Sequence, residues 1–290
     1  MVPELPEVET MRRGLLPIVG STVSDVRTPP CTRRPIVIRP GIGQIAKHLK
    51  HQTIRSIARL GKRVLIEFDG DWTLAIEPRM TGNVLLADPP TTEHLRLEVR
   101  LDGRDPSRVW FWDRRGLGTV TLYDRDQRSR ELEARYGPDA VDVQADTLRD
   151  RLRQSRRAVK VALLDQSAVA GIGNMYAAEI LFLAGVDPRT RCDRLSMPQW
   201  RRIAYQTRQV MAEAIRYEGS TLGDGTYRTA LNDPGGYQNH HRVYDRESQR
   251  CPRCQQSEIR RIVQAQRSTF FCPGCQRRSG IAGCVSADIG

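Results

Sequence analysis

The chain has 290 residues, 39% of them hydrophobic, which suits two domains of ordinary size with packed cores. No apolar run approaches the length of a membrane span, and the first residues carry glutamates instead of a signal peptide's basic start, so we expect a soluble, cytoplasmic protein without a membrane partner. The net charge of +12 favours polyanionic partners, nucleic acid before an anionic membrane surface.

A short amphipathic helix is predicted over residues 4–16. Its apolar residues recur at helical spacing and share one face: Leu5, Val8, Met11 and Leu15. Pro6 is tolerated in the first turn, where a missing backbone N–H breaks no hydrogen bond. The glutamates of this segment lie near the positive end of the helix dipole, a common place for acidic residues that have no catalytic role.

Segments that alternate between apolar and polar residues follow, and they predict β-strands. Residues 27–43, rich in proline and arginine, are expected to form a loop before them. The stretch RVLIEFDGDWTLAIE predicts a hairpin that turns at Asp69-Gly70-Asp71, and HLRLEVRLDG, RVWFWD and TVTLYD repeat the alternation. We therefore expect an N-terminal β-sandwich with one helix, within an α+β multidomain fold.

The pattern changes beyond residue 130. Gly137-Pro138 indicates a hinge, residues 145–217 show helical periodicity, and the glycine-rich residues 219–241 predict a loop. The expected division is a sandwich domain at 1–130, a linker at 131–144, a helical domain with its loop at 145–244, a cysteine module at 245–278 and a tail at 279–290.

Four of the seven cysteines form two CxxC pairs: Cys251, Cys254, Cys272 and Cys275. In a chain without a secretory signal, such pairs indicate a metal site rather than disulfides, and four thiolates match one tetrahedral Zn²⁺. Because a closed four-cysteine site leaves no ligand position for a substrate, we expect a structural zinc; reduced cysteines without metal are the alternative. Residues 246–278 also carry eight arginines against two glutamates, either a phosphate-contacting face or a solvated surface.

The sequence AGIGNMYAAEIL places Gly171 and Gly173 directly before a predicted helix. Glycine lets the backbone approach a phosphate closely, and the start of a helix offers N–H groups, here beside Asn174. The pattern is not GxGxxG and no strand precedes it. A tight corner between two helices that binds no ligand is therefore equally compatible with this motif.

PELPEVET, GIGN and the two CxxC pairs follow one another in the order found in one family. The chain resembles the formamidopyrimidine-DNA glycosylases, bacterial base-excision enzymes related to endonuclease VIII, from residue 3 to about residue 276. LPEVE favours the formamidopyrimidine branch over the PEGPE of endonuclease VIII. The resemblance implies a β-sandwich domain, a helix–two-turn–helix domain and a zinc-finger β-ribbon, with double-stranded DNA in the cleft between the two halves. Nothing in the sequence indicates an oligomer, and we expect a monomer.

Covalent chemistry at the N-terminal amine is what this resemblance implies. The damaged base is flipped out of the duplex, an amine attacks the sugar carbon, the base leaves, an imine forms and elimination cuts the backbone. An α-amine with a pKa of about 8 suits this step better than a lysine at about 10.4. By resemblance, Pro3 is the nucleophile, Glu4 the acid/base and Glu7 a supporting carboxylate. Without the family, all three are ordinary residues of a helix start.

DNA contacts are implied in the same way. Lys62 in LGKRVLIE matches the family's phosphate-contacting lysine and joins the catalytic group; taken alone, it is an exposed lysine at a strand edge. Lys160 and Asn174 stand at DNA-binding positions of the family. Arg267 in QRSTFFC matches the zinc-finger arginine that grips the phosphates beside the lesion.

The void left by the flipped base is filled in this family by a methionine, an arginine and a phenylalanine. IEPRMTG supplies Met80, and WDRRGLG supplies Arg115. Compared with the family's DPRRFG, Leu117 replaces phenylalanine and Arg114 replaces proline. Leucine is still able to wedge between bases, with less stacking; Met80 and Leu117 are alternatively plain hydrophobic packing.

The loop that holds the flipped base also departs from the family. In GSTLGDGTY, Gly223 stands where a lysine or arginine usually follows the leucine. The loop extends to Tyr237, which we expect to contact DNA. The preferred lesion, the opposite base and the choice between one and two elimination steps are open at this stage.

Removal of Met1 is favoured by the small Val2, but it leaves Val2 joined to Pro3 by an amide, and an amide nitrogen does not attack. Three interpretations follow: a second aminopeptidase cut exposes Pro3, Val2 attacks with its own primary amine, or imine chemistry is lost while lesion binding remains. We rank the first two above the third, because the other family residues fit an intact enzyme.

Three hypotheses of function result. The leading one is a bifunctional DNA glycosylase and AP lyase that removes oxidised purines such as 8-oxoguanine and formamidopyrimidines through an imine intermediate. The second is a non-catalytic protein that binds damaged or abasic DNA. The third is a general zinc-dependent nucleic-acid binder, which would bind damaged and intact DNA equally.

Overall fold

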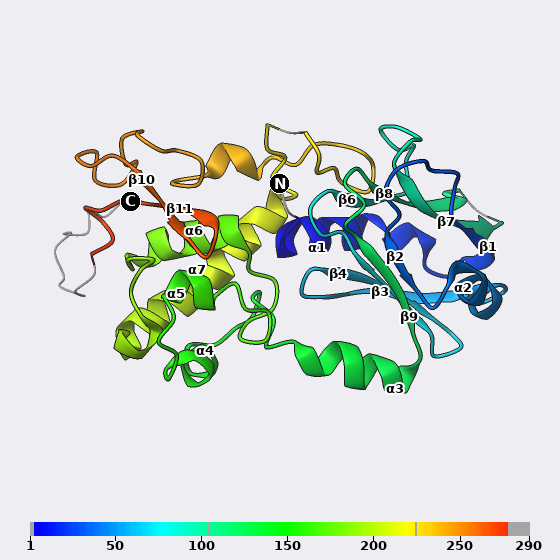
Figure 1. Ribbon diagram of the computed structural model, residues 1–290, viewed down its shortest axis with the longest axis horizontal. Helices are drawn as coiled ribbons and strands as arrows, with labels where there is room; N and C mark the ends of the chain where they lie inside the picture. Colours follow the sequence, from blue (N-terminus) through cyan, green and yellow to red (C-terminus); the bar gives the residue numbers. More distant parts are fainter. Residues whose placement is uncertain (1–2, 104, 224, 278–290) are drawn as a thin grey trace. The chain divides into compact units, whose positions relative to one another are not determined.

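The computed structural model describes residues 3–103, 105–223 and 225–277. The chain divides into two compact units, one made of the residues up to 136 together with 212–239 and the other of 137–211 together with the residues from 240 onward. Figure 1 gives the labels of the helices and strands. The interpretations that concern Val2 and the tail at 279–290 lie outside the described residues.

The first unit contains two β-sheets and the helix that opens the chain. Its elements are α1 (Leu5–Gly14), η1 (Leu16–Ile18), β1 (Thr22–Arg27), β2 (Val37–Arg39), α2 (Ile42–Leu49), β3 (Ile54–Leu60), β4 (Arg63–Phe68), β5 (Thr73–Glu77), β6 (Gly82–Leu85), β7 (Leu95–Asp102), β8 (Arg108–Asp113), β9 (Thr119–Tyr123), α3 (Arg125–Gln127), η2 (Arg128–Leu132) and η3 (Glu133–Arg135).

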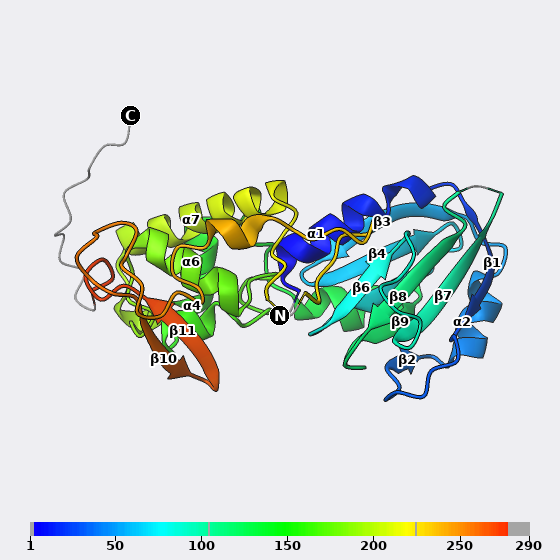
Figure 2. The ribbon, with the colours of Figure 1, turned by 90° about the horizontal axis from the view of Figure 1, so that it is seen from above.

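The two sheets form the expected sandwich. One is antiparallel, with the strand order β1-β7-β8-β6, and the other has the order β2-β9-β5-β4-β3, in which only the pair of β2 and β9 is parallel. The predicted hairpin of β4 and β5 is confirmed, with Asp71 in its turn at a φ of 59°. Figure 2 shows α1 beside β3 and β4.

Helix α1 belongs to the core of this unit. Its residues Val8 and Met11 are fully buried, in one hydrophobic cluster with Ile66 of β4 and Phe111 of β8. This packing agrees with the amphipathic pattern predicted from the sequence. Because the helix is held by the core, the residues at its N-terminal end have fixed positions.

Residues 27–43 differ in part from the predicted loop. Val37–Arg39 form β2, which pairs in parallel with β9 over Thr119, Val120 and Thr121. A three-residue strand between prolines carries no local signal. Its hydrogen bonds come from a partner about eighty residues later in the chain, so local periodicity had no means to indicate it.

The second unit is helical and ends in a two-stranded ribbon. Its elements are α4 (Ala145–Leu152), α5 (Val159–Ala162), α6 (Asn174–Ala184), η4 (Cys192–Arg194), the greater part of α7 (Met197–Arg216), β10 (Arg260–Gln264) and β11 (Arg267–Phe271).

The predicted loop at residues 219–241 lies almost entirely in the first unit. Where it is described, it contains no α-helix or strand, only the 3₁₀ turn η5 (Tyr237–His240). The helices of the second unit were expected from the helical periodicity of residues 145–217, and the ribbon of β10 and β11 from the spacing of the two CxxC pairs. No described helix is long and apolar enough to cross a membrane.

Candidate functional site

Two buried carboxylates lie at the start of α1. Glu4 is 3% exposed, Glu7 is fully buried, and Pro3 directly before them is buried as well. The Glu7 carboxylate accepts the backbone N–H of Glu4 at 2.8 Å with Oε2 and that of Ser220 at 2.9 Å with Oε1. Buried carboxylates persist where donors replace water. The structure therefore brings together all three described residues for which the sequence indicated catalytic chemistry at the N-terminus.

The segment after α7 completes this acidic pair, and sequence reasoning missed it. Gly219 has a φ of 75°, and a Cβ at this position would lie 2.8 Å from Glu7 Oε1. The hydroxyl of the buried Tyr227 donates to the carbonyl of Glu218 at 2.9 Å. Glycine suits position 219 for two reasons: the positive φ favours a residue without a Cβ, and a Cβ would collide with the Glu7 carboxylate. The contact between Glu7 and Ser220 joins residues 213 positions apart, so no local pattern predicts it. The glycine before Ser220 is the sequence feature that agrees with it.

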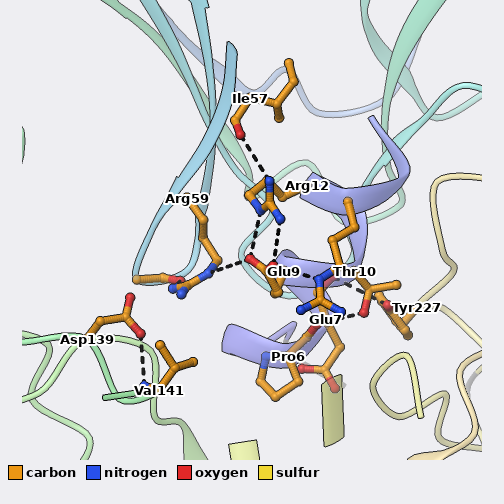
Figure 3. A network of polar contacts seen from close by, with 12 residues as sticks. Pro6, Glu7, Glu9, Thr10, Arg12, Ile57, Arg59, Asp139, Val141 and Tyr227 are labelled. Atoms are coloured by element: carbon orange, nitrogen blue, oxygen red, sulfur yellow. Dashed lines mark hydrogen bonds and ion pairs between the residues drawn. The ribbon is translucent and has the colours of Figure 1, made fainter. Parts of the chain in front are cut away.

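A network around Glu9 connects α1 with the turn that carries Lys62 (Figure 3). The Glu9 carboxylate accepts from Arg12 Nε at 2.9 Å, and from Arg59 Nε at 3.2 Å. Arg59 also donates through Nη1 to the carbonyl of Gly61 at 3.0 Å. Lys62 follows in the turn between β3 and β4 and is half-buried, not at an exposed strand edge.

Electrostatics favour the charged form of Glu9. Burial alone would raise the pKa of this carboxyl, but hydrogen bonds from Arg12 and Arg13 outweigh burial and lower it. Glu9 precedes these arginines by three and four residues, the spacing at which opposite charges pair along a helix, so the pairing is readable from the sequence.

The residues expected to fill the DNA void lie together on two turns of the first unit. Met80 is in the turn between β5 and β6, and Arg115 and Leu117 are in the turn between β8 and β9. Arg115 Nη1 lies 3.0 Å from Met80 Sδ. Arg115 is exposed, and Met80 and Leu117 are half-buried, so all three side chains reach the surface.

Tyr237 ends the loop in which we expected the flipped base. Its side chain is fully buried, its hydroxyl lies 3.5 Å from Glu213 Oε2, and its N–H donates to the carbonyl of Gly219 at 2.9 Å. Its ring therefore supports the loop from inside. Gly223, in contrast, is exposed, and a Cβ added at this position would meet no atom within 4 Å.

In the second unit, a chain of hydrogen bonds joins the GIGN corner to the ribbon. The fully buried Lys160 of α5 donates through Nζ to Asn174 Oδ1. Asn174, the first residue of α6, donates through Nδ2 to the carbonyl of Ser268 at 2.9 Å. Arg267 precedes Ser268 and is exposed at the start of β11. Three of the predicted DNA-binding residues are thus connected within one unit.

The four cysteines form a compact cluster. Their sulfur atoms all lie within 4.8 Å of one another, and two sulfur pairs are 3.8 Å apart. A disulfide needs about 2.05 Å, whereas a tetrahedron with metal–sulfur bonds of about 2.3 Å places its sulfurs roughly 3.8 Å apart. The cluster therefore fits a tetrahedral metal ion.

Backbone donors around the sulfurs also suit thiolate ligands. The N–H of Cys275 points to Cys272 Sγ at 3.4 Å. Burial would raise the pKa of Cys254, but the backbone N–H groups of Gln256 and Ser257 outweigh it and lower this pKa to about 6. Burial raises the pKa of Cys272 to about 11. Such a cluster carries four thiolates only when a cation replaces its protons.

Comparisons with known proteins agree with this arrangement. Residues 2–120 match the "Formamidopyrimidine-DNA glycosylase N-terminal domain", and residues 136–225 match the "Formamidopyrimidine-DNA glycosylase H2TH domain". The formamidopyrimidine-DNA glycosylase of Chloroflexus aurantiacus is 41% identical over 278 residues, which cover 95% of this chain and 98% of that protein.

Solved structures show the same fold. The crystal structure of the MutM (Fpg) protein from Thermus thermophilus has 36% identity and a TM-score of 0.82, and the match covers 94% of this chain and 98% of that one. A Lactococcus lactis Fpg mutant in complex with Fapy-dG-containing DNA has 34% identity and a TM-score of 0.84, with 95% and 100% covered.

Proposed function

The chain belongs to the formamidopyrimidine-DNA glycosylase family, and from this membership we propose that it is a DNA repair glycosylase that excises oxidised purines from duplex DNA and then cuts the strand as an AP lyase. The observation that carries the proposal is the buried pair of Glu4 and Glu7 at the start of α1, directly after Pro3. The DNA with a Fapy-dG lesion in the related Lactococcus lactis complex supports oxidised purines as the substrate class.

The proposed reaction begins with attack of the N-terminal amine on C1′ of the damaged nucleotide. Glu4 donates a proton to the sugar oxygen or the departing base, and the amine then forms an imine with the opened sugar. Loss of the proton next to the imine carbon allows elimination of the 3′ phosphate. Glu7, held by two backbone N–H groups, keeps the start of α1 and the segment at Ser220 in register with Glu4.

We assign the attacking amine to Pro3 exposed by removal of Val2, or to Val2 itself. Both routes use a neutral α-amine, and both place it next to the acidic pair in the sequence. Loss of imine chemistry with retained binding is the competing hypothesis, and the trapping experiment below separates all three.

DNA is the proposed partner, and one Zn²⁺ is the proposed structural ion. Lys62, Lys160 and Arg267 would supply positive charge to the phosphates, and the neutral amide of Asn174 would contribute a hydrogen bond. Met80, Arg115 and Leu117 would fill the void. Cys251, Cys254, Cys272 and Cys275 would hold the zinc, which stabilises the ribbon that carries Arg267. In this proposal the residues up to 130 carry the chemistry and fill the void, and those at 145–244 and 245–278 supply further contacts to the DNA.

Borohydride trapping on a duplex with 8-oxoguanine tests the proposal. We expect a covalent adduct, and the mass of the N-terminal peptide will show whether Val2 or Pro3 carries it. Glu4→Gln should lose base release by a factor of roughly 10² or more, on the order of general acid–base catalysis. Glu131→Gln, an exposed residue outside the site, should react as the native protein does. Absence of adduct, base release and strand cleavage together would refute the proposal.

A further inference from the structure

Two turns that are distant in the sequence carry the proposed void-filling side chains. Met80 precedes Thr81 between β5 and β6, and Arg115 and Leu117 follow the end of β8. Arg115 Nη1 contacts Met80 Sδ, Arg115 is exposed, and Met80 and Leu117 are half-buried. Both turns therefore need support from buried residues beneath these side chains.

Asp113, the last residue of β8, occupies that position. Its side chain is fully buried between the two turns. Oδ1 accepts the Thr81 hydroxyl at 2.5 Å and the N–H of Arg115 at 3.2 Å. Oδ2 accepts the N–H of Leu117 at 2.8 Å and that of Gly118 at 2.7 Å. One carboxylate thus binds donors from both turns.

The hydroxyl of Thr81 completes the connection. It donates to Asp113 and accepts the N–H of Arg115 at 2.9 Å. Thr81 is 6% exposed and follows Met80 directly. Its hydroxyl therefore holds the turn between β5 and β6 against the backbone of the turn between β8 and β9.

The backbone of Asp113 is itself anchored. Its N–H donates to the carbonyl of His94 at 2.9 Å, and its carbonyl accepts Arg96 Nε at 2.9 Å. Arg96 is 4% exposed. Asp113 is therefore a rigid part of the sheet, and the two turns take their positions from it.

We propose that Asp113, together with Thr81, is a positioning residue that preorganises Met80, Arg115 and Leu117 for insertion into the DNA void. The inference rests on the proposed function and assigns a role to two buried residues beneath the turns. A wedge between bases has to be held close to its bound geometry, and support from beneath reduces the ordering that DNA binding would otherwise require. This support matters more here because Leu117 offers less stacking surface than phenylalanine.

A duplex with a tetrahydrofuran abasic analogue opposite 2-aminopurine tests the role without any chemistry. The fluorescence of 2-aminopurine reports changes in stacking when side chains enter the void. At saturating protein, we expect Asp113→Asn to lose most of the native fluorescence change, because an amide cannot accept all four donors. The preference for abasic over intact duplex should fall roughly 10-fold, the loss typical of a hydrogen bond to a charged group.

Thr81 supplies a second pair of variants if Asp113→Asn does not fold. Thr81→Val removes the hydroxyl at equal size and should reduce the fluorescence change, whereas Thr81→Ser keeps the hydroxyl and should restore it. Asp102→Asn, the same substitution at an exposed position of the same sheet, should match the native protein. Each variant is measured below its own unfolding temperature, so that a general loss of stability does not alter the saturated signal.

The outcomes are distinct. A native-like signal in folded Asp113→Asn, or equal signals in Thr81→Val and Thr81→Ser, would overturn the positioning role. A native protein that traps DNA covalently but gives no 2-aminopurine signal would overturn this inference alone. A native protein that neither traps DNA nor releases a base would overturn the proposed function.

Discussion

Gly219 and Glu7 illustrate how single residues define the proposed catalytic end of α1. The glutamates at 4 and 7 were identified from the sequence through family motifs. Gly219 and Ser220, which lie against Glu7, were not, because a contact between α1 and the segment after α7 leaves no local periodicity. The backbone N–H groups of Glu4 and Ser220 both donate to the buried Glu7 carboxylate and compensate for its lost hydration.

Gly219→Ala should therefore disturb the site. The new methyl group would lie 2.8 Å from Glu7 Oε1 at a φ of 75°, so both strain and displacement of the carboxylate are expected. We expect a loss of about 1–3 kcal/mol in the free energy of unfolding, measured by urea denaturation, and slower base release. At the exposed Gly223, an added Cβ would meet no other part of the protein within 4 Å, so Gly223→Ala should leave the stability unchanged. Equal effects of both substitutions would contradict this account of Gly219.

Glu9 has a predicted pH signature. Its pKa is lowered in the folded protein, so the charged network stabilises the fold above the ordinary value of 4.5 and this contribution is lost as the pH falls through the folded value. Glu9→Gln should reduce the free energy of unfolding at pH 7 by roughly 1–3 kcal/mol. The difference between native and variant proteins should shrink as the pH falls below 4.5. Urea denaturation across this range checks it; a difference that does not depend on pH would exclude the charge as its cause.

At the scale of elements, the strands and helices with strong periodicity were predictable. The hairpin of β4 and β5 and the helical segments of the second unit appear where their patterns indicated. Strand β2 was not predicted, because β9, the strand with which it pairs, is distant in the sequence. The CxxC spacing indicated a ribbon, and the structure places β10 and β11 between the two cysteine pairs.

The ribbon offers a metal prediction. Cys272→Ser should release the proposed zinc, because one of four thiolates is lost, and should weaken DNA binding because the ribbon folds around its ion. Zinc content by mass spectrometry of the intact protein and binding to abasic duplex are the measurements. Cys31→Ser, a cysteine outside the cluster, should keep one zinc per chain. Full zinc stoichiometry in Cys272→Ser would contradict the four-cysteine site.

At the scale of the whole molecule, composition indicated a nucleic-acid partner but not where the DNA contacts lie. Arginines contribute most of the net charge of +12 and occur throughout the chain. Many of them form ion pairs within the fold, such as Arg128 with Glu67 and Arg189 with Asp187. Which arginines stay available for phosphates depends on these tertiary partners. The boundary between the two units falls inside helix α7, between Met211 and Ala212. No feature of the sequence indicates this point.

The salt dependence of DNA binding distinguishes a direct phosphate contact of one arginine from the long-range electrostatic attraction of the net positive charge. Arg267→Ala and Arg130→Ala each remove one positive charge from an exposed position, so a purely global field would weaken binding equally. A direct phosphate contact releases counterions, and its loss should reduce the slope of log K against log salt by about 0.9. We expect this reduction for Arg267→Ala, with similar losses on damaged and intact duplexes, and a native slope for Arg130→Ala. Fluorescence anisotropy at several salt concentrations provides both slopes. Equal slopes for the two variants would mean that Arg267 acts only through net charge, and the proposed grip of the ribbon on the DNA backbone would have to be abandoned.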